Sequence, residues 1–108
     1  MIAQTPAPPY YAVIFTSVLS TDDNEGYGEM GRLMIETAAA QTGFLGIESA
    51  RNEVGITVSY WSSLADIRQW KLHADHLIAQ RLGREKWYRH YKLRVCLVER
   101  DAEMGMGE

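Results

Sequence analysis

Hydrophobic and polar positions along this chain form six segments, four of which have the pattern of a β-strand. Residues 10–19 are rich in aromatic and β-branched side chains, and both faces of the predicted strand are apolar. The two faces are formed by Tyr11, Val13 and Phe15 and by Ala12, Ile14 and Val18. Residues 44–52 and 56–61 predict two more strands, and the short connection 53–55 predicts that they form an antiparallel hairpin. Residues 91–100 predict the fourth.

Two segments have the spacing of amphipathic helices. Apolar side chains recur at helical intervals over residues 25–41, and Gly43 is a natural stop just past that helix. Ser63 with Asp66 three residues later resembles a capping box and predicts the start of a second helix, whose apolar stripe reaches Ile78. Residues 84–90 then predict a loop or a short turn of helix before the last strand.

The predicted order is β-α-β-β-α-β, a ferredoxin-like α+β fold with a four-stranded antiparallel sheet. Residues 1–108 are predicted to form one domain with a core at about 10–100, an extended lead-in at 1–9 and a frayed tail at 101–108. Two helices cover one face of such a sheet, yet the first and last strands are apolar on both faces. A second copy is therefore predicted to cover the open sheet face, giving a homodimer that forms a dimeric α+β barrel.

The composition of the chain indicates where in the cell the protein is expected to work. The single cysteine, Cys96, excludes an intramolecular disulfide and lies in an apolar run, which predicts a small buried hydrophobe. Residues 1–9 have neither the basic start nor the apolar core of a signal peptide, and no apolar run approaches the length that spans a bilayer. These features predict a cytoplasmic protein without a membrane partner.

Charge is unevenly distributed. Residues 68–94 hold eight basic and two acidic side chains, whereas residues 1–67 hold two basic and eight acidic. Such a segment is typical of a solvated helix face, of an anion site or of a nucleic-acid surface. The net charge of −3 and the absence of a zinc or glycine-rich motif favour the first two, so no nucleic-acid partner is expected.

Three local pieces then resemble one known family. Residues 42–46 (TGFLG) resemble its helix-to-strand junction, and residues 56–63 (ITVSYWSS) resemble its third strand running into a capped helix. Residues 67–76 (IRQWKLHADH) resemble its "W…H…H" helix. In order, and over about residues 10–100, these pieces resemble the antibiotic biosynthesis monooxygenase family, whose members are dimeric α+β barrels.

The resemblance implies oxygenation of aromatic polyketides without metal or flavin, although another branch of the family degrades haem. The polyketide-type members use an asparagine and a tryptophan around the end of the third strand. Trp61 matches that tryptophan, but Thr57 stands near the asparagine position. Trp70 matches the tryptophan of the haem-degrading members, while Thr16 or Ser17 stands where they need asparagine and Gln80 where they need histidine. The haem branch is therefore disfavoured.

Cofactor-independent oxygenation needs a dry pocket, a base and a donor that holds developing charge. His73 or His76 is the candidate base, Trp61 is a second catalytic candidate, and Arg81 is the candidate that steadies an anion. The predicted substrate-binding residues, between sheet and helices, are Thr57, Tyr60, Trp70, Trp87, Tyr88 and Tyr91. We thus predict a monooxygenase for a small phenol- or quinone-type molecule, with no cofactor and no metal.

Each candidate also has a structural interpretation. Trp61 and Trp70 stand where a core needs large apolar groups, and tyrosines near residue 90 more often pack than catalyse. His73 and His76 are spaced like metal ligands but have no third ligand nearby in sequence. The alternative function is a non-catalytic small-ligand-binding or regulatory dimer on the same scaffold.

Overall fold

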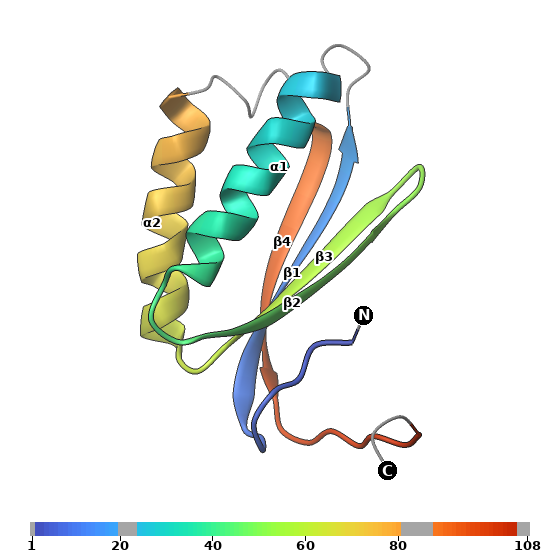
Figure 1. Cartoon of the computed structure of the whole chain (residues 1–108), viewed down its shortest axis with the longest axis vertical. Coiled ribbons are helices and arrows are strands. Elements are labelled where there is room, and N and C mark those ends of the chain that lie inside the picture. The colour runs from blue at the N-terminus through green and yellow to red at the C-terminus, as the bar shows by residue number, and fades with distance from the viewer. Residues whose placement is uncertain (1, 20–23, 81–87, 106–108) are drawn as a thin grey trace.

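The computed structural model describes residues 2–19, 24–80 and 88–105. Six elements follow in the predicted order, which confirms the βαββαβ fold: β1 (Tyr10–Leu19), α1 (Asn24–Ala39), β2 (Phe44–Arg51), β3 (Gly55–Trp61), α2 (Leu64–Gln80) and β4 (Tyr88–Val98). The strands form one antiparallel sheet in the order β2-β3-β1-β4. Both helices lie on the same side of that sheet (Figure 1).

The last strand departs from the sequence-based boundary. β4 starts at Tyr88, so the prediction of a loop or helical turn at residues 88–90 is wrong, and residues 84–87 lie outside the described residues. Tyr88 pairs with Leu19 across a register irregularity between Val18 and Leu19. The strand is longer than its apolar pattern because backbone pairing with β1 continues where the side chains turn polar.

Strand register assigns each side chain to one face of the sheet. Tyr11 pairs with Trp61 and Val13 with Ser59, and these odd-numbered positions of β1 and β3 face the helices. Ala12 pairs with Tyr60, so the even-numbered positions form the opposite, open face. Both apolar faces predicted for residues 10–19 are therefore present in β1.

A compact junction fixes α1 and α2 to the ends of β2 and β3. Gly43 has a φ of 85°, and its carbonyl accepts a hydrogen bond from the Ser62 amide at 2.9 Å. The Ser63 hydroxyl accepts a hydrogen bond from the Asp66 amide at 3.1 Å, as an N-cap does. The Asp66 carboxylate in turn accepts from the Ser63 and Ser62 hydroxyls at 2.8 and 2.9 Å. Two of the three family-like segments thus meet at this junction.

The buried core lies between the helices and the centre of the sheet. Val13, Ala38, Trp61 and Ile67 form it, and Trp61 is 0% exposed. Partly buried apolar side chains surround this core: Tyr11, Phe44, Trp70 and Leu93. One residue from each of β1, α1, β3 and α2 therefore holds the two layers together.

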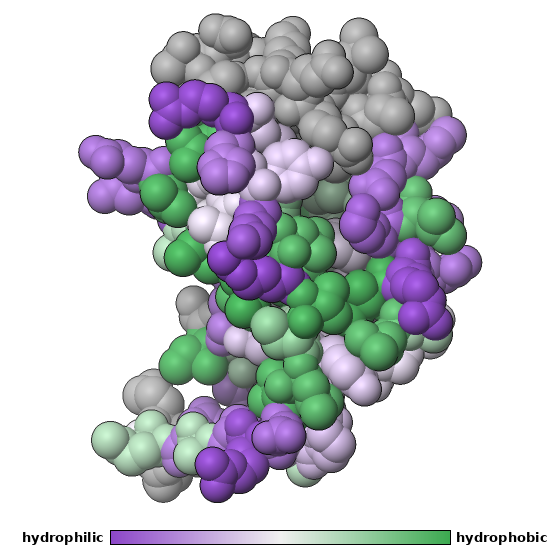
Figure 2. Space-filling model, turned by 180° about the vertical axis from the view of Figure 1, so that it is seen from behind, coloured by the Kyte–Doolittle hydropathy of each residue, from purple (hydrophilic) through white to green (hydrophobic). Residues whose placement is uncertain are grey.

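Apolar surface remains outside this core. The helices pack mainly over one half of the sheet, where α1 contacts β2 and α2 contacts β3. On the edge strand β4, the side chains of Val95 and Leu97 are therefore still 47% and 50% exposed. On the open face Ile56 is 46% exposed. The rear of the molecule shows hydrophobic side chains gathered across its middle (Figure 2). Among the described residues, neither helix is long and apolar enough to cross a membrane.

Candidate functional site

Aromatic side chains concentrate where the sheet meets α2. The ring of Trp61, at the end of β3, lies 5.5 Å from that of Phe44 and 5.4 Å from that of Trp70, between centroids. The cap at Ser63 sets the start of α2, and Trp70 follows about two turns later on the side that faces the sheet. We call Phe44, Trp61 and Trp70 the tryptophan cluster.

The two indole N–H groups of this cluster differ in their partners. Trp61 Nε1 donates to Ser59 Oγ at 2.9 Å, and both side chains are buried. Trp70 Nε1 is also buried, yet it has no hydrogen-bond partner among the described residues. The indole donor of Trp61 is thus satisfied within the protein, whereas that of Trp70 is not.

A second aromatic group lies further along the same face. Phe15 lies 5.4 Å from Tyr88 and 5.4 Å from Tyr91, and the two tyrosine rings are 5.6 Å apart. Phe15 is four residues from Tyr11, the partner of Trp61, so the two groups are separated by about 13 Å along β1. The helix-facing side of the sheet is therefore aromatic at both ends.

The structure brings together only part of the predicted site. Trp61 and Trp70 are in contact, and Thr57 faces the helices beside Phe15. Tyr60 lies on the open face, because neighbouring residues of a strand point to opposite faces, so it does not share a site with Trp61.

The predicted base and the predicted anion-binding residue are not part of the tryptophan cluster in the described structure. His73 and His76 are both exposed on α2. Arg81 and Trp87 lie outside the described residues. The tryptophan cluster therefore has no titratable partner from the predicted set in the described structure.

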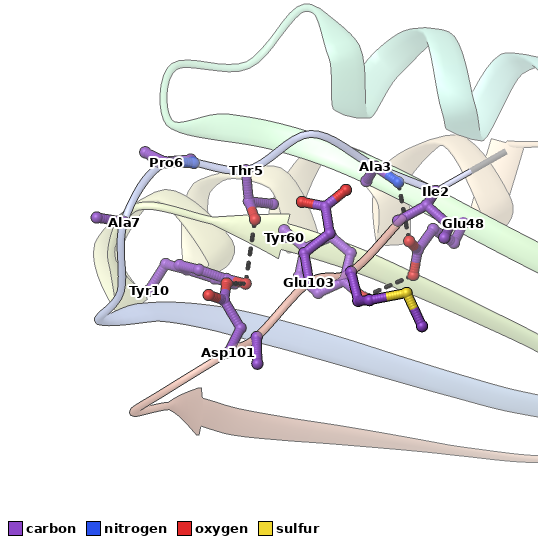
Figure 3. A pocket seen from close by; sticks show the side chains of 12 residues that line it. Ile2, Ala3, Thr5, Pro6, Ala7, Tyr10, Glu48, Tyr60, Asp101 and Glu103 are labelled. Atoms are coloured by element: carbon purple, nitrogen blue, oxygen red, sulfur yellow. Dashed lines mark hydrogen bonds between the residues drawn. The ribbon is translucent and has the colours of Figure 1, made fainter. Parts of the chain in front are cut away.

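A cavity of about 430 Å³ lies on the open face, near the two ends of the chain (Figure 3). The N-terminal lead-in and the C-terminal segment cross the sheet there, and β1, β2 and β3 form its floor. Its lining residues are Ile2, Ala3, Thr5, Pro6, Ala7, Tyr10, Glu48, Tyr60, Asp101, Ala102, Glu103 and Met104. Three of these are carboxylates, and no lysine, arginine or histidine is among them.

Glu48 joins the lead-in to the sheet within this cavity. Its two carboxylate oxygens accept hydrogen bonds from the Tyr60 hydroxyl at 2.7 Å and from the Ala3 amide at 2.9 Å (Figure 3). The bond from Tyr60, then that from Ala3, lowers the pKa of the Glu48 carboxyl below its usual value. Burial and the bond to Glu48 raise the pKa of Tyr60 to about 12.

Tyr10 joins the C-terminal segment to the same face. Its hydroxyl donates to Asp101 Oδ2 at 2.6 Å and accepts from the Thr5 hydroxyl at 3.1 Å. The bond to Asp101, which carries a negative charge, is the largest cause of a raised pKa of Tyr10. The Tyr10 and Tyr60 rings meet edge to face at 5.8 Å. Two tyrosine–carboxylate pairs therefore hold both ends of the chain against the sheet.

Several residues that make hydrogen bonds in the structure were not predicted from the sequence. Glu48 is the only charged residue between Phe44 and Ala50, an available signal that its face meets a polar partner. Arg51 donates to the hydroxyl and the carbonyl of buried Ser17 on the helix-facing side. Ser59 gave no signal, because a serine within a strand is usually a solvated position.

Solved structures of other proteins share this fold. SnoaB, a cofactor-independent oxygenase from Streptomyces nogalater, superposes with a TM-score of 0.67 at 10% identity, over 94% of this chain and 100% of that one. PA3566 from Pseudomonas aeruginosa superposes with a TM-score of 0.66 at 14% identity, over 90% of this chain and 99% of that one. A conserved protein from Methanosarcina mazei Go1 superposes with a TM-score of 0.69 at 10% identity, over 86% of this chain and 94% of that one. The chain thus shares its fold with a cofactor-independent oxygenase and with two putative antibiotic biosynthesis monooxygenases, and the sequence resemblance is confirmed at the level of the fold.

A bacterial relative defines the family more narrowly. Uncharacterized protein YqjZ of Bacillus subtilis is 50% identical over 101 residues, which cover 92% of this chain and 88% of the relative. The chain belongs to the same family as YqjZ. No family model matches the chain.

Proposed function

We propose that the protein is a cofactor-independent monooxygenase that binds a small phenol- or quinone-type molecule between the helices and the sheet. The observation that carries this proposal is the pair of aromatic groups at the two ends of that layer, on a fold shared with a cofactor-independent oxygenase. Aromatic walls bind flat aromatic molecules through apolar burial and ring contacts. They also keep water from the reacting carbon.

The proposed reaction needs little from the protein beyond binding. A phenol or anthrone loses a proton, and its anion transfers one electron to O₂. The resulting radical pair forms a C–O bond, the peroxide anion takes up the proton that the substrate lost, and the hydroperoxide then loses water. One oxygen atom remains on the substrate as a carbonyl and the other leaves as water. The protein would hold the ring and stabilise the oxyanion with hydrogen-bond donors.

The first proton transfer needs a group that accepts the proton of the substrate. His73 and His76 remain the candidate bases, although their exposure places them on the surface of α2. A His73→Ala/His76→Ala variant that keeps full oxygen uptake would assign deprotonation to the substrate's own acidity or to another group. A loss of uptake with unchanged ligand affinity would support the histidines.

The test of the proposal is a thermal-shift screen against anthrones, hydroquinones, flavonoids, haem and flavin, followed by oxygen uptake with each compound that binds. A phenolic compound should raise the melting temperature and consume one O₂ per molecule, and Trp70→Phe should reduce both effects. Ser49→Ala, an exposed position on β2, is the matched control. If no phenol or anthrone in the panel consumes oxygen, the monooxygenase proposal is wrong.

The alternative is a non-catalytic small-ligand-binding dimer on the same scaffold. Two observations favour it: Thr57 stands near the position where the polyketide-type oxygenases have asparagine, and both candidate bases are exposed. A compound that stabilises the protein at a stoichiometry of one per chain, without oxygen uptake or product, would support this alternative over the oxygenase.

We also propose that two copies pair through their open sheet faces, as the fold's typical assembly implies. The open face carries apolar Ile14, Ile56 and Val58, and on β4 a row of exposed basic residues, His90, Lys92 and Arg94. The carboxylates around the open-face cavity lie at the other end of the sheet. A two-fold arrangement can therefore place basic residues of one copy near acidic residues of the other.

Light scattering after size-exclusion chromatography tests this assembly. The wild-type chain should have the mass of a dimer, and Val58→Asp should reduce it to that of a monomer, because an unpaired carboxylate would be buried in the interface. Leu72→Asp, at an exposed position on α2, is the control. A monomeric wild type at micromolar concentration would contradict the proposal. The cytoplasm stays the predicted location.

A further inference from the structure

One row of four side chains crosses the open face of the sheet from one edge strand to the other. Strand register aligns one residue of each strand, in the order Glu48, Val58, Ile14 and Arg94. The row therefore has a carboxylate on β2, a guanidinium on β4 and two half-buried apolar side chains between them. We call these four residues the charged row.

The two charged ends of this row do not pair with each other within one chain. Glu48 accepts hydrogen bonds from two neutral groups, the Tyr60 hydroxyl and the Ala3 amide, and no lysine, arginine or histidine lines the described walls of the cavity around it (Figure 3). Arg94 is exposed and makes no ion pair within the described part of the chain. Three strand spacings keep the Cα atoms of Glu48 and Arg94 about 14 Å apart.

A two-fold axis parallel to the strands, through the middle of the charged row, makes the row complementary to itself. This axis places β2 of one copy over β4 of the other, so that Glu48 faces Arg94 of the second copy and Val58 faces Ile14 of the second copy. An axis perpendicular to the strands would instead lay β2 over β2 and β4 over β4, and like charges would face each other. Charge complementarity therefore selects the axis parallel to the strands.

We infer that Arg94 of a second copy enters the open-face cavity and binds the Glu48 carboxylate there, twice in each dimer. Packed sheets lie about 10 Å apart, a gap that an arginine and a glutamate reaching from opposite sides can span. A guanidinium binds a carboxylate through two parallel hydrogen bonds, and a carboxylate that already accepts two bonds has room for more. This inference rests on the proposed pairing of two copies through their open faces, to which it adds the axis and the contact.

Charge reversal tests this contact, with the dimer dissociation constant of the full chain measured by analytical ultracentrifugation. Arg94→Glu and Glu48→Lys should each raise the constant at least about a hundredfold, because each places two pairs of like charges at the interface. The double variant Arg94→Glu/Glu48→Lys should bring it back close to the wild-type value, since the two charges are exchanged. Arg68→Glu, at an exposed position on α2 on the other side of the sheet, is the control and should leave the constant unchanged.

Cross-linking tests the same contact without changing Glu48 or its hydrogen bonds. In Arg94→Lys, a carbodiimide should join the introduced lysine to Glu48 as an amide. When ¹⁵N-labelled and unlabelled chains are mixed, mass spectrometry should find linked pairs of one labelled and one unlabelled peptide, which arise only between copies.

The outcomes separate this inference from the pairing on which it rests. If the wild type is a dimer but Arg94→Glu leaves its dissociation constant unchanged, the inference is wrong and the pairing stands. The same holds if the double variant stays as weak as the single ones, or if no mixed cross-link joins position 94 to Glu48. A monomeric wild type would overturn the pairing and the inference together.

Discussion

Replacing Ser59 by alanine should destabilise the protein by leaving a second buried indole donor without a partner. Ser59 and Trp61 are both buried, and the hydroxyl of the first accepts the N–H of the second at 2.9 Å. The change removes one oxygen atom and leaves the Trp61 ring in place. Its cost is therefore the desolvation of the N–H rather than a loss of packing.

The expected magnitude follows from that single group. A buried donor that loses its partner costs about 1–3 kcal/mol, and we expect about 2 kcal/mol here because Trp61 is fully buried. With a urea m-value of about 2 kcal/mol/M, the denaturation midpoint should fall by about 1 M. Against a total stability of about 5–15 kcal/mol, this loss is large for one oxygen atom.

Urea denaturation followed by tryptophan fluorescence measures this effect, at one fixed protein concentration because an assembling protein gains stability with concentration. Ser49→Ala, an exposed serine on the neighbouring strand, should change stability by less than about 0.5 kcal/mol. In a Trp61→Phe background Ser59→Ala should be nearly neutral, since no N–H is left to satisfy. An equal loss in both backgrounds would refute the hydrogen-bond explanation.

Three further predictions concern the α1–β2 junction and the open face. Gly43→Ala should cost about 2 kcal/mol by chemical denaturation, because a Cβ there meets the Asp66 carboxylate and the backbone has positive φ; an unchanged midpoint would contradict this. A titration followed by tyrosine absorbance should include one hydroxyl that ionises near pH 12. Tyr60→Phe should remove this step, and Glu48→Gln should lower its pKa toward 10. A titration that neither variant changes would disprove the pairing of Tyr60 with Glu48. Because the folded-state pKa of Glu48 is lowered, its contribution to stability is present above about pH 4.5 and is lost as pH falls through the folded-state value. The free energy of unfolding, measured from pH 6 to 3, should therefore fall more steeply for the wild type than for Glu48→Gln. Parallel curves for the two proteins would contradict this role of Glu48.

The fold was predictable because its signals are local and repeated. Aromatic and β-branched side chains along residues 10–19 predict the first strand, the short connection 53–55 predicts a hairpin, and Ser63 with Asp66 marks the start of α2. The start of β4 at Tyr88 was missed, because it depends on backbone pairing with Leu19 rather than on side-chain pattern.

The site was less predictable because it depends on orientation. Tyr60 and Trp61 look equally suitable for an aromatic pocket in the sequence, yet strand alternation separates them by the thickness of the sheet. Trp61 and Trp70 also look alike, and only the position of Ser59 shows which indole is satisfied. Partners distant in sequence, such as Tyr10 and Asp101, leave no periodic signal at all.

The tyrosine–carboxylate pairs on the open face have a practical consequence for work with this protein. Ala3 is bound to Glu48 and Asp101 to Tyr10, so anything fused ahead of residue 2 or beyond residue 105 leaves the molecule close to the same face. A purification tag at either end would then stand beside the surface proposed to pair. The mass measured for a tagged chain would report on the tag as much as on the protein, so assembly is best studied after tag removal.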